Sequence, residues 1–105
     1  MNYEEYRKWQ PSYASYKLNN FNKRDSQAQA IKEMSAEAGE VLSILTKADR
    51  KRKEIDRDKI IDEVGDTFWG LTGILNEFDI SLEELMEYNF NKLTKRYKEH
   101  SEKWE

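Results

Sequence analysis

Apolar side chains recur every three or four residues along most of the chain, and this spacing restricts its fold more than any other feature. It predicts a helix over residues 26–49, another over 59–78, and a last one that Ser81 and Glu84 begin as a capping box. The first residues carry an aromatic stripe at the same spacing, which Pro11 interrupts. With one proline, four glycines and no convincing strand, the chain is predicted to be all-α and four-helix bundle-like.

Size and charge exclude several classes of protein. We expect residues 1–105 to form a single helical domain with a small core, which favours assembly with further copies. The 18 basic and 21 acidic side chains give a net charge of −3, so no nucleic acid polymer is expected as a partner. The absence of long apolar runs and of a signal-peptide segment predicts a cytoplasmic protein without membrane contact. The charged run over residues 49–58 is interpreted as a solvated turn.

Two pairs of carboxylates lie at the edges of the predicted apolar faces. The sequence EAGE places Glu37 and Glu40 in one predicted helix, and EVGD places Glu63 and Asp66 in the next. At about 100° per residue both pairs fall near the border of the buried stripe, so antiparallel packing would bring them together. Oxygen ligands without histidine or cysteine suit Mg²⁺, with Mn²⁺ as a substitute. The alternative is an ordinary solvated face, because charged side chains are mostly exposed.

Two further features accompany these acids. Gly70 and Gly73 lie on the acidic side of their helix, where each costs about 1 kcal/mol relative to alanine. Either another helix backbone approaches there, or something other than a side chain fills the space. In the last predicted helix, Asn89, Lys92 and Arg96 place an amide and two cations near an apolar stripe. They would either pair with the acids as buried salt bridges or face an anionic ligand such as a polyphosphate.

The order of these motifs resembles a known family. EAGE at Glu37 to Glu40, EVGD at Glu63 to Asp66 and the later NFNKLTKRY are similar to the pattern of the MazG-like all-α nucleoside triphosphate pyrophosphohydrolase superfamily. That superfamily also contains dimeric dUTPases and dCTP pyrophosphatases. The resemblance covers about residues 27–97, and it implies a MazG-like helical fold in a homodimer or homotetramer.

The resemblance also implies a role for individual residues. The implied Mg²⁺ ligands are Glu37, Glu40, Glu63 and Asp66. The residues implied to contact substrate phosphate or sugar are Asn89, Lys92 and Arg96. Trp69 resembles an aromatic residue that contacts the nucleobase, although ordinary packing explains it equally well. Either Glu37 or Glu40 is the implied catalytic base, and no catalytic role is carried onto the first 25 residues.

The implied reaction is the hydrolysis of a nucleoside triphosphate between its α and β phosphates, which gives the monophosphate and pyrophosphate. Such a reaction serves nucleotide metabolism or the cleansing of the nucleotide pool. Two alternatives stay open. The same site would act on alarmones or modified nucleotides, or the chain would be a non-catalytic helical oligomerisation module in which acids and bases form interhelical salt bridges.

Overall fold

The computed structural model describes residues 1–104, and it describes the side chains of residues 1–99. The described residues form helices and turns without a strand, which confirms the all-α prediction. In chain order the elements are α1 (Tyr3–Trp9), the 3-10 helix η1 (Gln10–Ser12), α2 (Ser15–Leu18), α3 (Lys23–Lys51), α4 (Arg57–Glu77) and α5 (Leu82–Trp104). Within residues 1–104, no helix is both long and apolar enough to cross a lipid bilayer.

Each of the three long helices begins at a polar side chain that accepts a backbone hydrogen bond from the first turn. Asp56 Oδ1 accepts the Asp58 N–H at 2.9 Å before α4, and Asn22 caps α3 in the same way. Ser81 Oγ accepts the Glu84 N–H at 3.0 Å, so the predicted cap of α5 is confirmed. Such caps stabilise a helix start by about 1 kcal/mol, which explains why the predicted boundaries are close to the observed ones.

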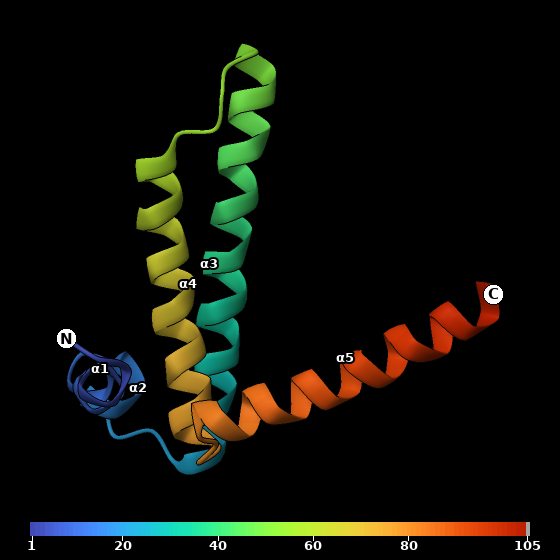
Figure 1. Ribbon diagram of the computed structural model, residues 1–105. Coiled ribbons are helices and arrows are strands. Elements are labelled where there is room, and N and C mark those ends of the chain that lie inside the picture. The colour runs from blue at the N-terminus through green and yellow to red at the C-terminus, as the bar shows by residue number, and fades with distance from the viewer. Residues whose placement is uncertain (105) are drawn as a thin grey trace.

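The body of the fold is an antiparallel hairpin in which α3 and α4 pack along their length (Figure 1). The connection between them spans only residues 52–56. Arg52 ends α3 in the left-handed conformation, with φ of 53°, and its N–H bonds back to the last turn. The residues around this connection are exposed. The prediction of a solvated turn is therefore confirmed. The turn is shorter than predicted, because α3 and α4 both extend into residues 49–58.

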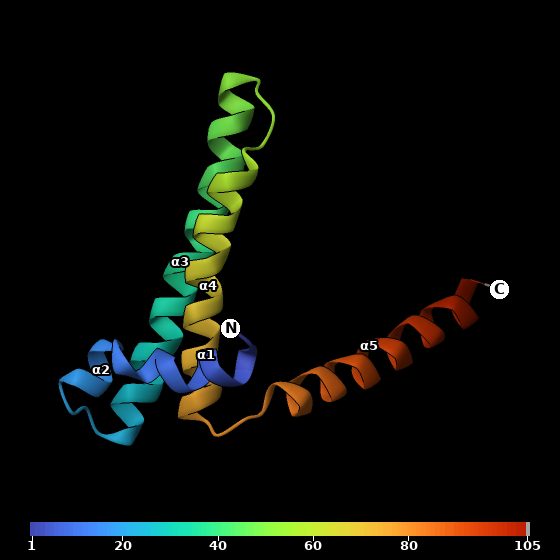
Figure 2. The ribbon, with the colours of Figure 1, turned by 60° about the vertical axis from the view of Figure 1, so that its left-hand side comes forward.

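The aromatic N-terminal segment lies across the hairpin at the end opposite the turn (Figure 2). Pro11 divides it into α1 and α2 with η1 between them, as its position predicted. Tyr3 and Tyr6 pack on Phe68 of α4, with ring centroids 5.9 and 5.2 Å apart. The core remains small. The buried apolar residues of the described chain are Ala14, Tyr16, Ala30, Ile44, Ala48 and Leu75.

The last helix, α5, does not lie along the hairpin of its own chain. It begins near the end opposite the turn and projects away in both views (Figure 1; Figure 2). The side chains of Met86, Tyr88, Phe90 and Tyr97 on this helix are exposed. The radius of gyration is 17.4 Å, whereas a compact chain of this length has about 13 Å. No other described element covers α5. The described helices of one chain therefore do not form a closed four-helix bundle.

Candidate active site

Three of the four predicted carboxylates come together in the middle of the hairpin. Glu37 lies on α3, Glu63 and Asp66 lie on α4, and one oxygen atom of each is within 4.8 Å of the others. Glu37 and Glu63 are half-buried, whereas Asp66 is exposed. We call these three residues the acid group. Glu40 is outside it, about one helical turn closer to the hairpin turn.

The carboxylates of this region repel one another. Partial desolvation raises the pKa of Glu63 above its ordinary value, and the negative charges of Asp62, Asp66, Glu40 and Glu37 raise it further. A divalent cation between these oxygens would remove the repulsion and favour the charged carboxylates. Because the acid group offers oxygen atoms only, its donor set fits a hard ion such as Mg²⁺ or Mn²⁺.

A cavity of about 400 Å³ opens on the side of the acid group that faces the N-terminal segment. Tyr13 is an exposed part of its wall. Trp69 is half-buried, and it packs against the core around Tyr16 while it also lines the cavity. The position of Trp69 therefore fits both ordinary packing and contact with a nucleobase. We call this the aromatic cavity, and its lining residues are Tyr13, Ser15, Glu33, Glu37, Asp66, Trp69 and Gly70.

Glu33 belongs to the aromatic cavity although the sequence motif does not include it. Its Oε1 accepts hydrogen bonds from the Ser15 hydroxyl at 3.1 Å and from the Gln29 amide at 3.2 Å. Its Oε2 is buried, and no described polar atom is its hydrogen-bond partner. A buried acceptor of this kind destabilises the protein unless water or a ligand satisfies it. The spacing of four residues from Glu37 puts Glu33 on the same helix side, but only the fold shows the cavity.

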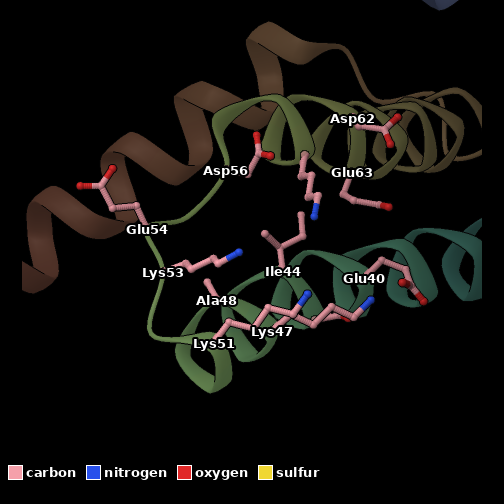
Figure 3. A pocket seen from close by; sticks show the side chains of 12 residues that line it. Glu40, Ile44, Lys47, Ala48, Lys51, Lys53, Glu54, Asp56, Asp62 and Glu63 are labelled. Atoms are coloured by element: carbon pink, nitrogen blue, oxygen red, sulfur yellow. The ribbon is translucent and has the colours of Figure 1, made fainter.

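A second cavity, of about 480 Å³, lies between α3 and α4 at the hairpin turn (Figure 3). Glu40 and Glu63 form the part of its wall that adjoins the acid group. We call it the lysine cavity, because its cationic lining residues are Lys47, Lys51, Lys53 and Lys59. Lys51 and Lys53 belong to the charged run that was predicted to be a solvated turn, and such a run does not reveal which side chains surround a cavity.

The comparison with protein families agrees with this geometry. The family described as MazG nucleotide pyrophosphohydrolase domain matches residues 25–101, which is most of the chain. The chain belongs to the MazG family. The matched range contains both carboxylate motifs and the NFNKLTKRY segment, so the resemblance is confirmed and the domain is of the nucleotide pyrophosphohydrolase type. Comparisons with curated proteins and with solved structures found no match.

In this MazG hairpin, Gly70 and Gly73 allow close packing. A Cβ atom on Gly70 would lie 2.7 Å from the backbone Cα of Met34 in α3. A Cβ atom on Gly73 would lie 2.5 Å from the Tyr16 hydroxyl and 2.8 Å from the Gln10 amide nitrogen. Neighbouring protein atoms therefore explain both glycines. Of the two alternatives, the close approach of another helix backbone is confirmed at Gly70, which also lines the aromatic cavity, and side chains of the N-terminal segment fill the space at Gly73.

The MazG motif residues of α5 lie away from the acid group of the same chain. Asn89, Lys92 and Arg96 are exposed, and α5 leaves the hairpin at the end opposite the turn (Figure 1). Among the side chains of residues 1–99, no ion pair joins α5 to α3 or α4. Within one chain these residues are thus neither salt-bridge partners of the acids nor neighbours of the same site.

Proposed function

We propose that this MazG domain is a Mg²⁺-dependent nucleoside triphosphate pyrophosphohydrolase, which cleaves an NTP or dNTP to the monophosphate and pyrophosphate. The observation that carries the proposal is the acid group of Glu37, Glu63 and Asp66, which lies between two cavities on one hairpin. Phosphoryl transfer depends on positioning and on stabilising the charge that spreads over the phosphate oxygens. An oxygen-only cation site with space on both sides meets these needs.

The residues that would hold Mg²⁺ are the three carboxylates of the acid group. The fit rests on their oxygen-only donor set and on the raised pKa of Glu63, which a bound cation would lower. When bound, the ion supplies Lewis acidity to the phosphate and lowers the pKa of water. Glu40 was also predicted as a ligand, and its place beside Glu63 keeps it near the same ion.

Either Glu37 or Glu40 is the proposed general base. Glu37 belongs to the acid group, whereas Glu40 lies outside it and lines the lysine cavity. The carboxylate that acts as the base accepts a proton from the attacking water while the water oxygen bonds to the α-phosphorus on the side opposite the leaving group. The other carboxylate contributes negative charge to the cation site.

The aromatic cavity is the proposed site of the nucleoside. Tyr13 and Trp69 offer ring faces against which a nucleobase can stack. The Oε2 atom of Glu33 offers a buried acceptor without a described partner. An amino group of the nucleobase or a hydroxyl of the sugar would satisfy this acceptor, so the cavity favours a ligand that can donate a hydrogen bond.

We also propose that the chain acts as a homodimer or homotetramer in the cytoplasm. The exposed apolar side chains of α5 and the large radius of gyration support assembly, because a second copy would cover this helix. In such an assembly Asn89, Lys92 and Arg96 of one copy would approach the acid group of another. Light scattering should show an oligomer, and a monomer that persists at all protein concentrations would contradict this part of the proposal.

The reaction is tested with a panel of NTPs, dNTPs, modified nucleotides and alarmones in the presence of Mg²⁺. Chromatography should show a monophosphate and pyrophosphate as products. Glu63→Gln and Asp66→Asn should lose this activity, whereas Glu5→Gln, which changes an exposed acid of α1, should keep it.

Two results would change the proposal. Release of orthophosphate in place of pyrophosphate, or no hydrolysis of any compound in the panel, would contradict it. Strong preference for an alarmone or a modified nucleotide would favour the alternative substrates on the same site.

A further inference from the structure

We propose that the lysine cavity binds the pyrophosphate part of the substrate, so that the nucleotide lies along the hairpin. The base then points toward α1 and α2, and the γ-phosphate points toward the hairpin turn. This inference rests on the proposed function, and it adds a site for the β and γ phosphates that a single chain provides. The cations of α5 are not part of it.

Four ammonium groups without an acidic partner line the lysine cavity. Lys47 and Lys51 belong to the last two turns of α3, Lys59 to the first turn of α4, and Lys53 to the connection. Figure 3 shows the amine of Lys53 directed into the space between the two helices. Among the side chains of residues 1–99, no carboxylate oxygen lies within 4.0 Å of any of these four amines. Because all four lysines are exposed, they are available to an anion from solution.

Five carboxylates also line the lysine cavity, although none of them forms an ion pair with a lysine: Glu40, Glu54, Asp56, Asp62 and Glu63. Asp56 is the N-cap of α4, and its carboxylate accepts a backbone N–H of the first turn at 2.9 Å. Glu54 and Asp62 also line the cavity, so their carboxylates offset part of the lysine charge. Glu40 and Glu63 lie at the side of the acid group, where a divalent cation would balance their charge. The N-terminus of α4 adds the positive end of a helix dipole.

The two cavities lie on opposite sides of the acid group along the hairpin. The lysine cavity includes Glu40 and Glu63, whereas the aromatic cavity includes Glu33, Glu37 and Asp66. A triphosphate whose α-phosphate lies at the acid group has a cation-lined space for its other phosphates on the lysine side. Both cavities contain carboxylates, which repel phosphate, but the charged residues of the aromatic cavity are carboxylates alone, whereas the lysine cavity also supplies four cations. This difference favours one direction for the substrate.

The lysines would also assist the bond-breaking step. The water oxygen bonds to the α-phosphorus, its proton passes to a carboxylate, and the bond from the α-phosphorus to the bridging oxygen breaks. The electron pair of that bond stays on the bridging oxygen, which leaves as part of pyrophosphate. Ammonium groups around the leaving group stabilise this added negative charge. Nucleoside diphosphates, which lack the γ-phosphate, should bind more weakly.

The test measures the binding of inorganic pyrophosphate to the full chain by isothermal titration calorimetry, first in EDTA and then in Mg²⁺. The test variant removes three charges of the cavity: Lys51→Gln, Lys53→Gln and Lys59→Gln. The control variant removes three exposed lysines outside it: Lys8→Gln, Lys23→Gln and Lys32→Gln. The test variant should bind pyrophosphate at least about tenfold more weakly, because the loss of a single hydrogen bond to a charged group already has this effect.

Two further measurements separate this site from its alternatives. The test variant should show a raised KM for the triphosphate with unchanged binding of the monophosphate and an unchanged melting curve. Equal pyrophosphate affinity in the test and control variants would overturn the inference, and so would loss of binding in Lys92→Gln and Arg96→Ala alone. If pyrophosphate binding depends on the cavity lysines but no nucleotide is hydrolysed, the site stands and the proposed reaction fails. Hydrolysis with lysine-independent pyrophosphate binding would reject only the site.

Discussion

Replacement of Gly70 by alanine tests how closely α3 and α4 approach each other. The new Cβ would lie 2.7 Å from the Cα and 3.0 Å from the Cβ of Met34. Carbon atoms pack favourably at about 3.5 Å or more, so the two helices would have to separate by roughly 0.8 Å at this point. The Cα of Met34 is a backbone atom, and no side-chain rotation relieves the contact. Thr72 of α4 and Ala30 of α3 are buried within about one turn of this contact, so the separation would expose them to solvent.

The size of the effect follows from two opposing terms. Alanine gains about 1 kcal/mol of helix propensity over glycine, whereas overpacking of a close contact costs up to about 3 kcal/mol. We therefore expect Gly70→Ala to lose about 2 kcal/mol of stability and to melt about 8 to 16 °C lower. Thermal unfolding should be followed by far-UV circular dichroism in EDTA at one protein concentration, because ligands and assembly also shift the melting temperature.

Gly39→Ala and Gly65→Ala are matched controls on the same two helices. A Cβ atom on either glycine meets nothing within 4 Å. Each control should therefore keep its propensity gain and increase stability by up to about 1 kcal/mol. If Gly70→Ala melts at or above the temperature of the unsubstituted chain, the reasoning from helix approach is refuted.

Four further outcomes are expected. Glu63→Gln should raise the stability of the metal-free protein at neutral pH. The raised pKa of Glu63 means that its destabilising effect is fully present above this pKa and disappears as the pH falls toward the ordinary value of 4.5, so melting curves of the two proteins should converge in acid. Addition of Mg²⁺ should raise the melting temperature and EDTA should reverse the change, and identical curves would show that the acids share no cation site. Lys17→Met should lower the free energy of unfolding by about 1 to 3 kcal/mol, because it removes the amine that lies 2.8 Å from the Glu77 carboxylate, and the Glu77 side chain is only 4% exposed. Lys8→Met removes one partner of an exposed ion pair, so it should lower the free energy of unfolding by less than about 0.5 kcal/mol. Arg96→Ala should lower NTP turnover and leave the melting curve unchanged, and a large loss of stability would instead indicate a structural salt bridge.

The helices themselves were predictable, because the interactions that define them act between residues close in sequence. The apolar spacing of three and four placed α3 and α4 to within a few residues, and the Ser81 cap was visible as a short motif. Pro11 marked the break between α1 and α2 for an equally local reason. The family could also be recognised from the sequence, since its motif is an ordered set of residues along the chain.

The candidate site was predictable only in part. Helical spacing placed Glu37, Glu63 and Asp66 at facing edges, and the structure brings these three together. The structure leaves Glu40 outside the group. It also shows a buried oxygen of Glu33 without a partner, which the sequence pattern did not indicate. Lys51 and Lys53 at the hairpin turn were interpreted from the sequence as part of an ordinary solvated charged run.

Amino-acid order alone determined which segments become helices and which side of each helix carries the acids, since both follow from the 3.6-residue repeat and from caps a few residues away. Only the tertiary structure decided that Gly70 meets the backbone of Met34, that two cavities flank the acid group, and that α5 leaves the hairpin. These features depend on distances between residues that are far apart in the chain. Such distances arise from how whole helices pack, and a local pattern carries no information about them.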